Sequence, residues 1–151
     1  MDFPKLNLPK FEFRYKKQNN KLYIFDTFRS KFVVLTPEEW VRQNVLEFLV
    51  QVKGYPRLWI AVEKEINING LKRRYDALVF NKNEDVLLLI ELKAPKITID
   101  EKVFNQISAY NFTLNAPLLL VSNGLSHYFA KVDLLKKSYE FLTEIPSFKA
   151  L

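Results

Sequence analysis

The 151-residue sequence predicts an α/β domain in which a central mixed β-sheet is flanked by helices. Two near-continuous apolar runs, residues 86–92 and 118–122, are typical of central strands covered on both faces. Two segments that begin with helix-capping residues carry apolar side chains at helical spacing. An Asn-Gly pair at 69–70 joins two further strand-like segments and predicts a β-hairpin.

The first 35 residues are predicted to form an extension that contains a β-hairpin. Residues 11–15 and 21–26 alternate apolar and polar side chains around Lys17-Gln18-Asn19-Asn20, which predicts a short hairpin. Residues 31–35 are predicted to be a further extended segment.

This extension is also the basic part of the chain. Eight Lys or Arg and three Asp or Glu occur in residues 1–35, whereas the whole chain has a net charge of +6. Arg14, Lys16 and Lys17 lie among aromatic residues, and we expect them to contact DNA phosphates without sequence preference. A solvated edge hairpin is the alternative interpretation.

The catalytic core is predicted to span residues 36–132. Thr36-Pro37-Glu38-Glu39 forms a capping box with proline at the first helical position, and the helix is expected to reach about Lys53 before Gly54. Strands are then predicted at residues 59–68, 71–80 and 86–92, the first two forming the Asn-Gly hairpin.

The second half of the core is predicted to contain one more helix and two more strands. Thr98-Ile99-Asp100-Glu101 is predicted to be another capping box, which opens a helix to about Leu114. Strands are predicted at residues 118–122 and 127–132, and residues 133–151 are expected to be a helical or mixed tail. Because no repeat or linker is visible, we expect residues 1–151 to form a single domain.

Composition limits the chemistry that the chain can perform. The absence of cysteine excludes disulfides, a thiolate nucleophile and zinc sites built on sulfur, and His127 is the single histidine. Carboxylates and lysines must therefore carry any catalysis. Neither a signal peptide nor an apolar segment of about 20 residues is visible, which predicts a cytoplasmic protein.

Asp76, Glu91 and Lys93 are the candidate catalytic residues. Asp76 lies in the second arm of the hairpin, and Glu91 and Lys93 follow a buried strand on one face, because side chains alternate along a strand. If the two strands pair, both carboxylates and the ammonium converge at one end of the sheet. Two hard oxygen ligands, with the carbonyl of Leu92 as a third, suit Mg²⁺ and hence phosphodiester hydrolysis.

A structural role is the alternative for these residues. Glu91 and Lys93 could form a same-face ion pair while Asp76 caps a turn. A charged group that follows five apolar residues is costly to bury unless it is paired or bound to a metal, and this favours a functional site.

Five segments of the chain resemble the N-terminal nuclease domain of type I restriction enzyme restriction subunits, which belongs to the PD-(D/E)XK superfamily. The segments are residues 36–43, 73–80, 87–95, 104–111 and 118–128. The resemblance implies a restriction-endonuclease-like core and a DNA endonuclease that uses Mg²⁺, or Mn²⁺ as a substitute. It also assigns catalytic positions to Gln106 and Tyr110, which would steer DNA or position Lys93, whereas a polar rim on a packing helix is the alternative.

The sequence departs from that family in two respects. No helicase motor is present, so translocation is not implied, and a separate motor or specificity subunit or a homodimer is expected instead. The superfamily often carries a glutamate on the first helix, for which Gln43, Glu39 and Glu47 are candidates.

Basic residues beside Asp76 point to nucleic acid, with or without catalysis. Lys72, Arg73 and Arg74 are expected to hold DNA phosphates, although a solvated hairpin arm would also explain them. A non-catalytic nucleic-acid-binding module, or an interaction subunit that retains the nuclease fold, is the alternative function.

Overall fold

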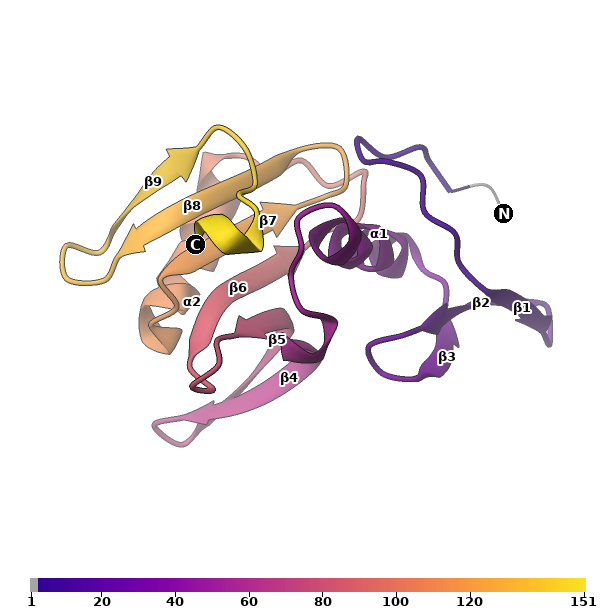
Figure 1. Ribbon diagram of the computed structural model, residues 1–151, viewed down its shortest axis with the longest axis horizontal. Helices are drawn as coiled ribbons and strands as arrows, with labels where there is room; N and C mark the ends of the chain where they lie inside the picture. Colours follow the sequence, from indigo (N-terminus) through magenta and orange to yellow (C-terminus); the bar gives the residue numbers. More distant parts are fainter. Residues whose placement is uncertain (1–2) are drawn as a thin grey trace.

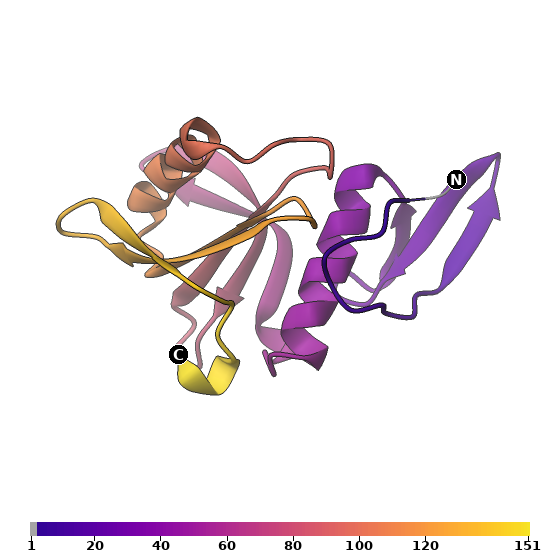
Figure 2. The same ribbon diagram turned by 90° about the horizontal axis from the view of Figure 1, so that it is seen from above.

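The computed structural model describes residues 3–151, apart from the side chains of Ile68 and Thr113. Figures 1 and 2 show four layers: a three-stranded sheet, helix α1, a six-stranded sheet and helix α2. The predicted α/β architecture with a mixed sheet between helices is therefore confirmed. No helix within residues 3–151 is long and apolar enough to cross a membrane.

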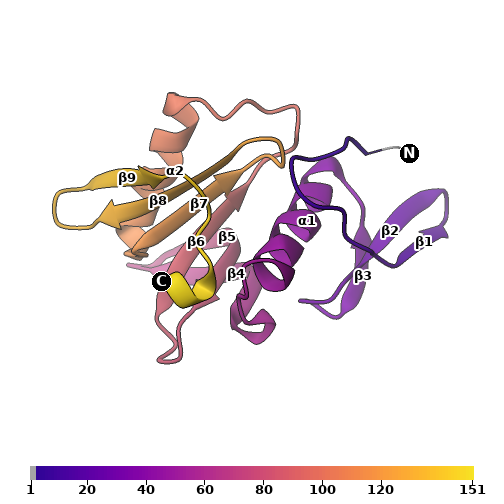
Figure 3. The same ribbon diagram turned by 45° about the horizontal axis from the view of Figure 1, so that its top comes forward.

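The three-stranded sheet is built by the N-terminal extension. It is antiparallel in the order β1-β2-β3, with β1 at Tyr15–Gln18, β2 at Lys21–Asp26 and β3 at Lys31–Val34. Strand β1 begins later than the predicted residue 11, because the segment before it packs against α1, where Phe13 contacts Trp40. Figures 1 and 3 show this sheet on the far side of α1 from the six-stranded sheet.

The six-stranded sheet has the order β4-β5-β6-β7-β8-β9. Strands β6 and β7 are parallel and every other neighbouring pair is antiparallel, since α2 provides the crossover that parallel strands need. The strand bounds are β4 Ile60–Ile68, β5 Leu71–Phe80, β6 Val86–Leu92, β7 Leu118–Ser122, β8 His127–Asp133 and β9 Ser138–Leu142.

The two long helices begin at side-chain caps. Helix α1 spans Pro37–Gln51, and the hydroxyl of Thr36 accepts a hydrogen bond from the backbone N–H of Glu39 at 3.0 Å. Helix α2 spans Glu101–Leu114 and is capped by Asp100, which accepts from the N–H of Val103. The capping box predicted at residue 98 is therefore wrong, because the chain is still extended where it buries Ile99 in the core.

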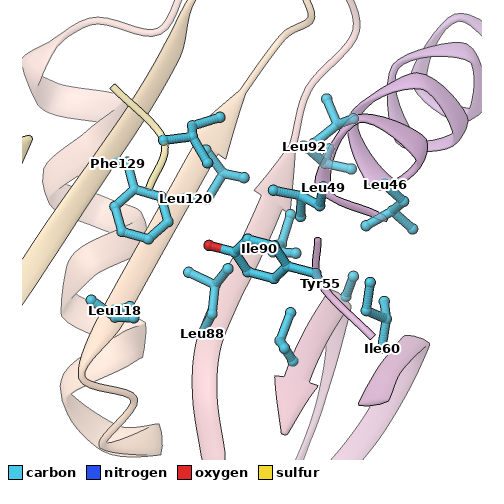
Figure 4. Close-up of a cluster of buried hydrophobic side chains, with 14 of the residues drawn as sticks. Leu46, Leu49, Tyr55, Ile60, Leu88, Ile90, Leu92, Leu118, Leu120 and Phe129 are labelled. Atoms are coloured by element: carbon cyan, nitrogen blue, oxygen red, sulfur yellow. The ribbon is translucent and has the colours of Figure 1, made fainter. Parts of the chain in front are cut away.

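One hydrophobic core lies on each face of the six-stranded sheet. Val41, Val45 and Leu49 of α1 pack on the first face, and Phe104 and Ile107 of α2 pack on the second. Figure 4 shows the first core, where the ring of Tyr55 lies among leucine and isoleucine side chains from the sheet and α1. The Tyr55 hydroxyl donates a hydrogen bond to the carbonyl of Pro146 at 3.1 Å, which ties the C-terminal segment to this core.

The C-terminal tail, predicted to be helical or mixed, is mixed and contains a strand. Residues Ser138–Leu142 form the edge strand β9, followed by a short 3₁₀ helix at Phe148–Ala150. Tyr139 and Phe141 of β9 pack their rings 4.8 Å from the ring of Phe104 on α2. These contacts between distant segments stabilise a strand that local patterning does not predict.

Candidate active site

Asp76 and Glu91 are brought together by the pairing of β5 with β6. In this antiparallel pair Ala77 lies opposite Ile90, so the next positions along the two strands are Asp76 and Glu91. Asp76 Oδ2 accepts the backbone N–H of Leu92 at 2.7 Å, which fixes the carboxylate against the end of β6. The strand pairing expected from the sequence therefore places both carboxyl groups at one edge of the sheet.

Lys93 follows directly after β6 and is also held by the backbone. Its N–H donates to the carbonyl of Ser122 on β7 at 2.9 Å, which extends the parallel ladder by one residue. Its ammonium lies within electrostatic reach of Glu91, since it favours the ionised form of that carboxyl group. The side chain is half-buried, which limits screening by solvent.

The carboxyl groups of Asp76 and Glu91 do not ionise independently. Burial, followed by the neighbouring Asp76 carboxylate and a hydrogen bond with it, raises the pKa of Glu91 to about 9. Two carboxyl groups in contact share a proton because both cannot ionise without a compensating charge. A divalent ion would supply that charge, and the available donors are the hard oxygens that Mg²⁺ prefers.

The donor set is small. Within the part of the chain that the structure describes, no cluster of three or more His, Asp or Glu side chains is placed to hold a metal. The protein ligands for an ion would therefore be Asp76 and Glu91, with the carbonyl of Leu92 between the functional residues.

Arg42 is a site residue that sequence reasoning missed. Its side chain rises from α1 and is only 4% exposed, with Nη2 3.5 Å from Asp76 Oδ1. Nη1 lies 3.3 Å from Glu39 Oε1 and 3.2 Å from Glu63 Oε1. A charged residue between the apolar positions Val41 and Val45 was the available signal, because a buried arginine requires carboxylate partners.

A second arginine extends this ion network to the N-terminal sheet. Arg29, in the turn between β2 and β3, contacts the buried Asp26, and its Nη2 lies 2.7 Å from Glu39 Oε1. Its Nη1 lies 3.2 Å from Glu63 Oε2. Glu63 adopts a positive φ of 53°, and the ladder between β4 and β5 omits the pair of Glu63 with Asp76 while keeping the same register on either side.

The three candidate ligands on α1 have other partners. Glu39 contacts both arginines of the network, and Gln43 donates to Glu39 Oε2 at 3.0 Å. Burial favours protonated Glu47, but hydrogen bonds from Arg57 and Gln51 lower its pKa overall. The structure does not bring Gln43 or Glu47 to the Asp76–Glu91 pair, and Arg42 separates Glu39 from it.

Glu38 is an acidic residue of α1 that interacts electrostatically with Asp76 and Lys93 of the candidate site. Partial burial, followed by the Asp76 carboxylate, raises the pKa of Glu38, while Arg42 and Lys93 act in the opposite direction. Sequence reasoning used Glu38 only as part of a capping box. The packing of α1 sets the rotation of the helix about its own axis, and this rotation directs Glu38 toward the site.

Tyr110 and Arg73 meet at the surface between α2 and β5. The Arg73 guanidinium lies 4.1 Å from the centre of the Tyr110 ring, and this ring is 49% exposed. Gln106 is exposed on the same helix, and no hydrogen bond among the described side chains joins it to Asp76, Glu91 or Lys93.

The remaining cations predicted to contact DNA are exposed. Arg74 lies 3.8 Å from Glu63, and Lys72 lies 3.9 Å from Glu65. Arg14, Lys16 and Lys17 lie on or beside β1, and Figure 3 shows β1 across α1 from β5 and β6, which carry the carboxyl pair. The charges predicted to bind DNA thus fall into two groups, one on β5 and one on the small sheet.

Comparisons with known proteins connect this geometry to a family. Residues 37–146 match the family model described as type I restriction enzyme R protein N terminus. No curated protein matches the sequence.

Among solved structures, a fragment of a candidate HsdR subunit of a type I restriction enzyme from Vibrio vulnificus has a similar fold, with a TM-score of 0.53 and 16% identity. The match covers 75% of this chain and 24% of that one, so this chain spans about a quarter of that protein's length. A candidate nuclease from Anabaena variabilis aligns with a TM-score of 0.48 and 11% identity, over 95% of this chain and 87% of that one.

Proposed function

This chain belongs to the type I restriction enzyme R protein N terminus family, and we propose that it is a Mg²⁺-dependent DNA endonuclease that hydrolyses phosphodiester bonds. The observation that carries the proposal is the contact between the Asp76 and Glu91 carboxyl groups, with Lys93 within electrostatic reach. All three residues lie inside the matched range, on two paired strands and the residue that follows.

Asp76 and Glu91 would hold the ion, with the Leu92 carbonyl as a further ligand and Mn²⁺ as a substitute. When bound, the ion would neutralise charge on the scissile phosphate and lower the pKa of a water molecule. The hydrogen bond from the N–H of Leu92 holds the Asp76 carboxylate at the end of β6, which supports this assignment. Glu91 must release its proton to bind a cation, since its pKa is raised to about 9 in the free protein.

Lys93 is proposed to act on the reacting atoms. An ammonium has no lone pair to give to a metal, so the residue does not serve as a ligand. As an ammonium it would orient the attacking water, favour loss of the water's proton to solvent through its positive charge, and stabilise negative charge that builds on phosphorus. Glu38 interacts electrostatically with Asp76 and Lys93, and it would attract the cation from the side of α1.

DNA would be held by the cations around this edge of the sheet. Arg73, stacked on Tyr110, presents both a charge and an aromatic surface beside β5, and Lys72 and Arg74 flank it. These contacts would place the phosphate backbone without reading base sequence. Gln106 lies one turn before Tyr110 on the exposed face of α2 and is proposed to steer the same strand.

The test is a cleavage assay with purified protein and plasmid, single-stranded and branched DNA, in Mg²⁺, Mn²⁺ or EDTA. We expect cleavage with either metal, and a rate about 10²-fold lower in Lys93→Ala, the scale of losing one acid–base or charge-stabilising group. Lys93→Arg should rescue poorly, because a planar guanidinium is bulkier and cannot place a compact point charge where the ammonium lies.

Lys96→Ala is the matched control, because it removes an exposed lysine three residues away. If wild-type protein cleaves DNA and Lys93→Ala cleaves it equally fast, the assigned site is wrong. If no DNA form is cleaved, a non-catalytic nucleic-acid-binding module or an interaction subunit becomes the better assignment. Because the matched family is that of a type I restriction enzyme subunit, we also propose a homodimer or a separate motor or specificity subunit as the partner of this chain.

A further inference from the structure

One face of the three-stranded sheet carries aromatic rings interleaved with cations. Alternation along β2 directs Ile24 and Asp26 into the protein, where both are fully buried, and directs Tyr23 and Phe25 to the opposite face. On that face Phe25 lies directly opposite Phe32 of β3, with ring centres 5.2 Å apart. We call this surface the aromatic face; it comprises Arg14, Lys16, Lys21, Tyr23, Phe25, Phe32 and Val34.

The aromatic face points away from the rest of the molecule. In Figure 2 the three strands lie outside α1, on the side opposite the six-stranded sheet. Tyr23, Phe25 and Phe32 are half-buried and Val34 is 42% exposed, and none of the four belongs to either hydrophobic core. An apolar surface that the fold itself does not use is typical of a binding site.

Cations lie over the rings of this face. The Arg14 guanidinium is 4.7 Å from the centre of the Phe25 ring and 5.7 Å from that of Phe32. The Lys16 ammonium is 4.6 Å from the centre of the Phe32 ring and 5.6 Å from that of Tyr23. These contacts place a cation over each of the three rings, and the rings of Phe25 and Phe32 meet at an interplanar angle of 67°.

The charge of the aromatic face has one sign. Arg14, Lys16 and Lys21 lie on it, and no Asp or Glu occupies a strand position on this side of the three strands, all of which are described. None of the ion pairs found among the described residues involves these three cations. The matching ligand is therefore a polyanion that also presents flat, unstacked rings.

We propose that the aromatic face binds single-stranded nucleic acid, with bases stacked on Tyr23, Phe25 and Phe32 and phosphates at Arg14 and Lys16. A cation and a base use the same π face, so each cation would move from its ring to a neighbouring phosphate as a base takes its place. Duplex DNA hides its base faces by stacking and could use only the cations. The proposal extends the phosphate contacts assigned to this extension and does not require that the chain cleaves DNA.

The experiment measures binding of a fluorescent oligothymidylate and of a matched duplex to the full chain in EDTA, where metal-dependent cleavage cannot interfere. We expect the single strand to bind at least about tenfold more tightly than the duplex, because base–aromatic stacking adds to charge attraction only for unstacked bases. Salt should weaken both complexes.

Two double variants separate stacking from charge. Phe25→Leu with Phe32→Leu keeps an apolar surface but removes two π faces, and should weaken single-strand binding about tenfold or more while leaving the salt slope unchanged. Arg14→Gln with Lys16→Gln should reduce the slope of log affinity against log salt by about 1.4, or about 0.7 for each phosphate that the variant no longer neutralises.

Matched controls lie at the far end of the molecule. Lys136→Gln with Lys137→Gln removes two exposed charges from the turn between β8 and β9, and Phe141→Leu removes an exposed ring from β9. Both should leave single-strand binding unchanged. Circular dichroism and thermal melting check folding, and Tyr23→Leu tests stacking if the Phe25 and Phe32 double variant does not fold.

Equal affinity for duplex and single strand, or unchanged single-strand binding in folded leucine variants, would overturn the proposal. A dimer that dissociates in these variants and does not bind the oligonucleotide would instead assign the face to a second copy of the chain. This test is independent of the nuclease proposal. Protein that cleaves no DNA could still bind the single strand, and protein that cleaves DNA could bind single strand and duplex equally well.

Discussion

Replacing Arg42 by methionine tests the ion network that joins α1 to the candidate site. Methionine keeps most of the length and apolar contact of the side chain but removes its charge. Glu39 and Glu63 keep Arg29 as a partner, whereas Asp76 loses the arginine that lies 3.5 Å from Oδ1. The substitution therefore leaves negative charge at Asp76 and Glu91 without its nearest buried cation.

The expected cost follows from the burial of each partner. Breaking a buried ion pair typically costs about 3–5 kcal/mol. The side chains of Arg42 and Glu39 are 5% and 9% exposed, whereas those of Asp76 and Glu63 are 19% and 34% exposed and are better screened. Because Arg29 still neutralises two of the carboxylates, we expect the low end, about 3 kcal/mol. At about 2–4 °C per kcal/mol for a chain of this size, the melting temperature should fall by about 6–12 °C.

Urea unfolding and thermal melting in EDTA measure this loss. Arg74→Met is the matched control, because Arg74 is 69% exposed at 3.8 Å from Glu63 and should change stability by no more than about 0.5 kcal/mol. A double-mutant cycle with Asp76→Asn should give a coupling of about 0.5–3 kcal/mol. If Arg42→Met lowers the free energy of unfolding by less than about 1 kcal/mol, or by as much as Arg74→Met does, the network has no stabilising role.

Three further predictions concern the carboxyl pair and one close backbone contact. Calorimetric titration should detect Mg²⁺ or Mn²⁺ binding that disappears in the Asp76→Ala, Glu91→Ala double variant, and binding that persists there would remove the metal assignment. In EDTA, stability should fall as pH rises from about 4.5 toward 9, because folded protein keeps the Glu91 proton while the unfolded chain releases it; a Glu91→Gln variant with the same pH dependence would contradict this. Gly124→Ala should destabilise the fold by about 1–3 kcal/mol, measured by urea unfolding, since φ is 86° and the new Cβ would lie 2.7 Å from Leu6 Cδ2. A neutral change would show that Leu6 moves aside freely.

Strands β5, β6 and β7 could be predicted to the residue because their signals are local. An Asn-Gly turn starts β5, and apolar runs bounded by turn residues mark the other two. The neighbourhood of Asp76 and Glu91 follows from pairing those strands, since an antiparallel pair leaves few registers that bury every apolar residue. Strand β9 could not be found in this way, because its rings gain stability from Phe104, which lies more than 30 residues earlier.

The amino-acid sequence by itself determined the α/β class, the approximate positions of the helix caps at Thr36 and Asp100, and the convergence of Asp76 with Glu91. Each of these features depends on residues that are neighbours along the chain or on a single pair of strands. Only the tertiary structure decided which polar groups of α1 reach the carboxyl pair. The family resemblance suggested Gln43, Glu39 or Glu47, whereas Glu38 and Arg42 face the site. The physical reason is that packing of α1 between two sheets sets its rotation, and Arg29 and Arg57 from other segments take the carboxylates of Glu39 and Glu47.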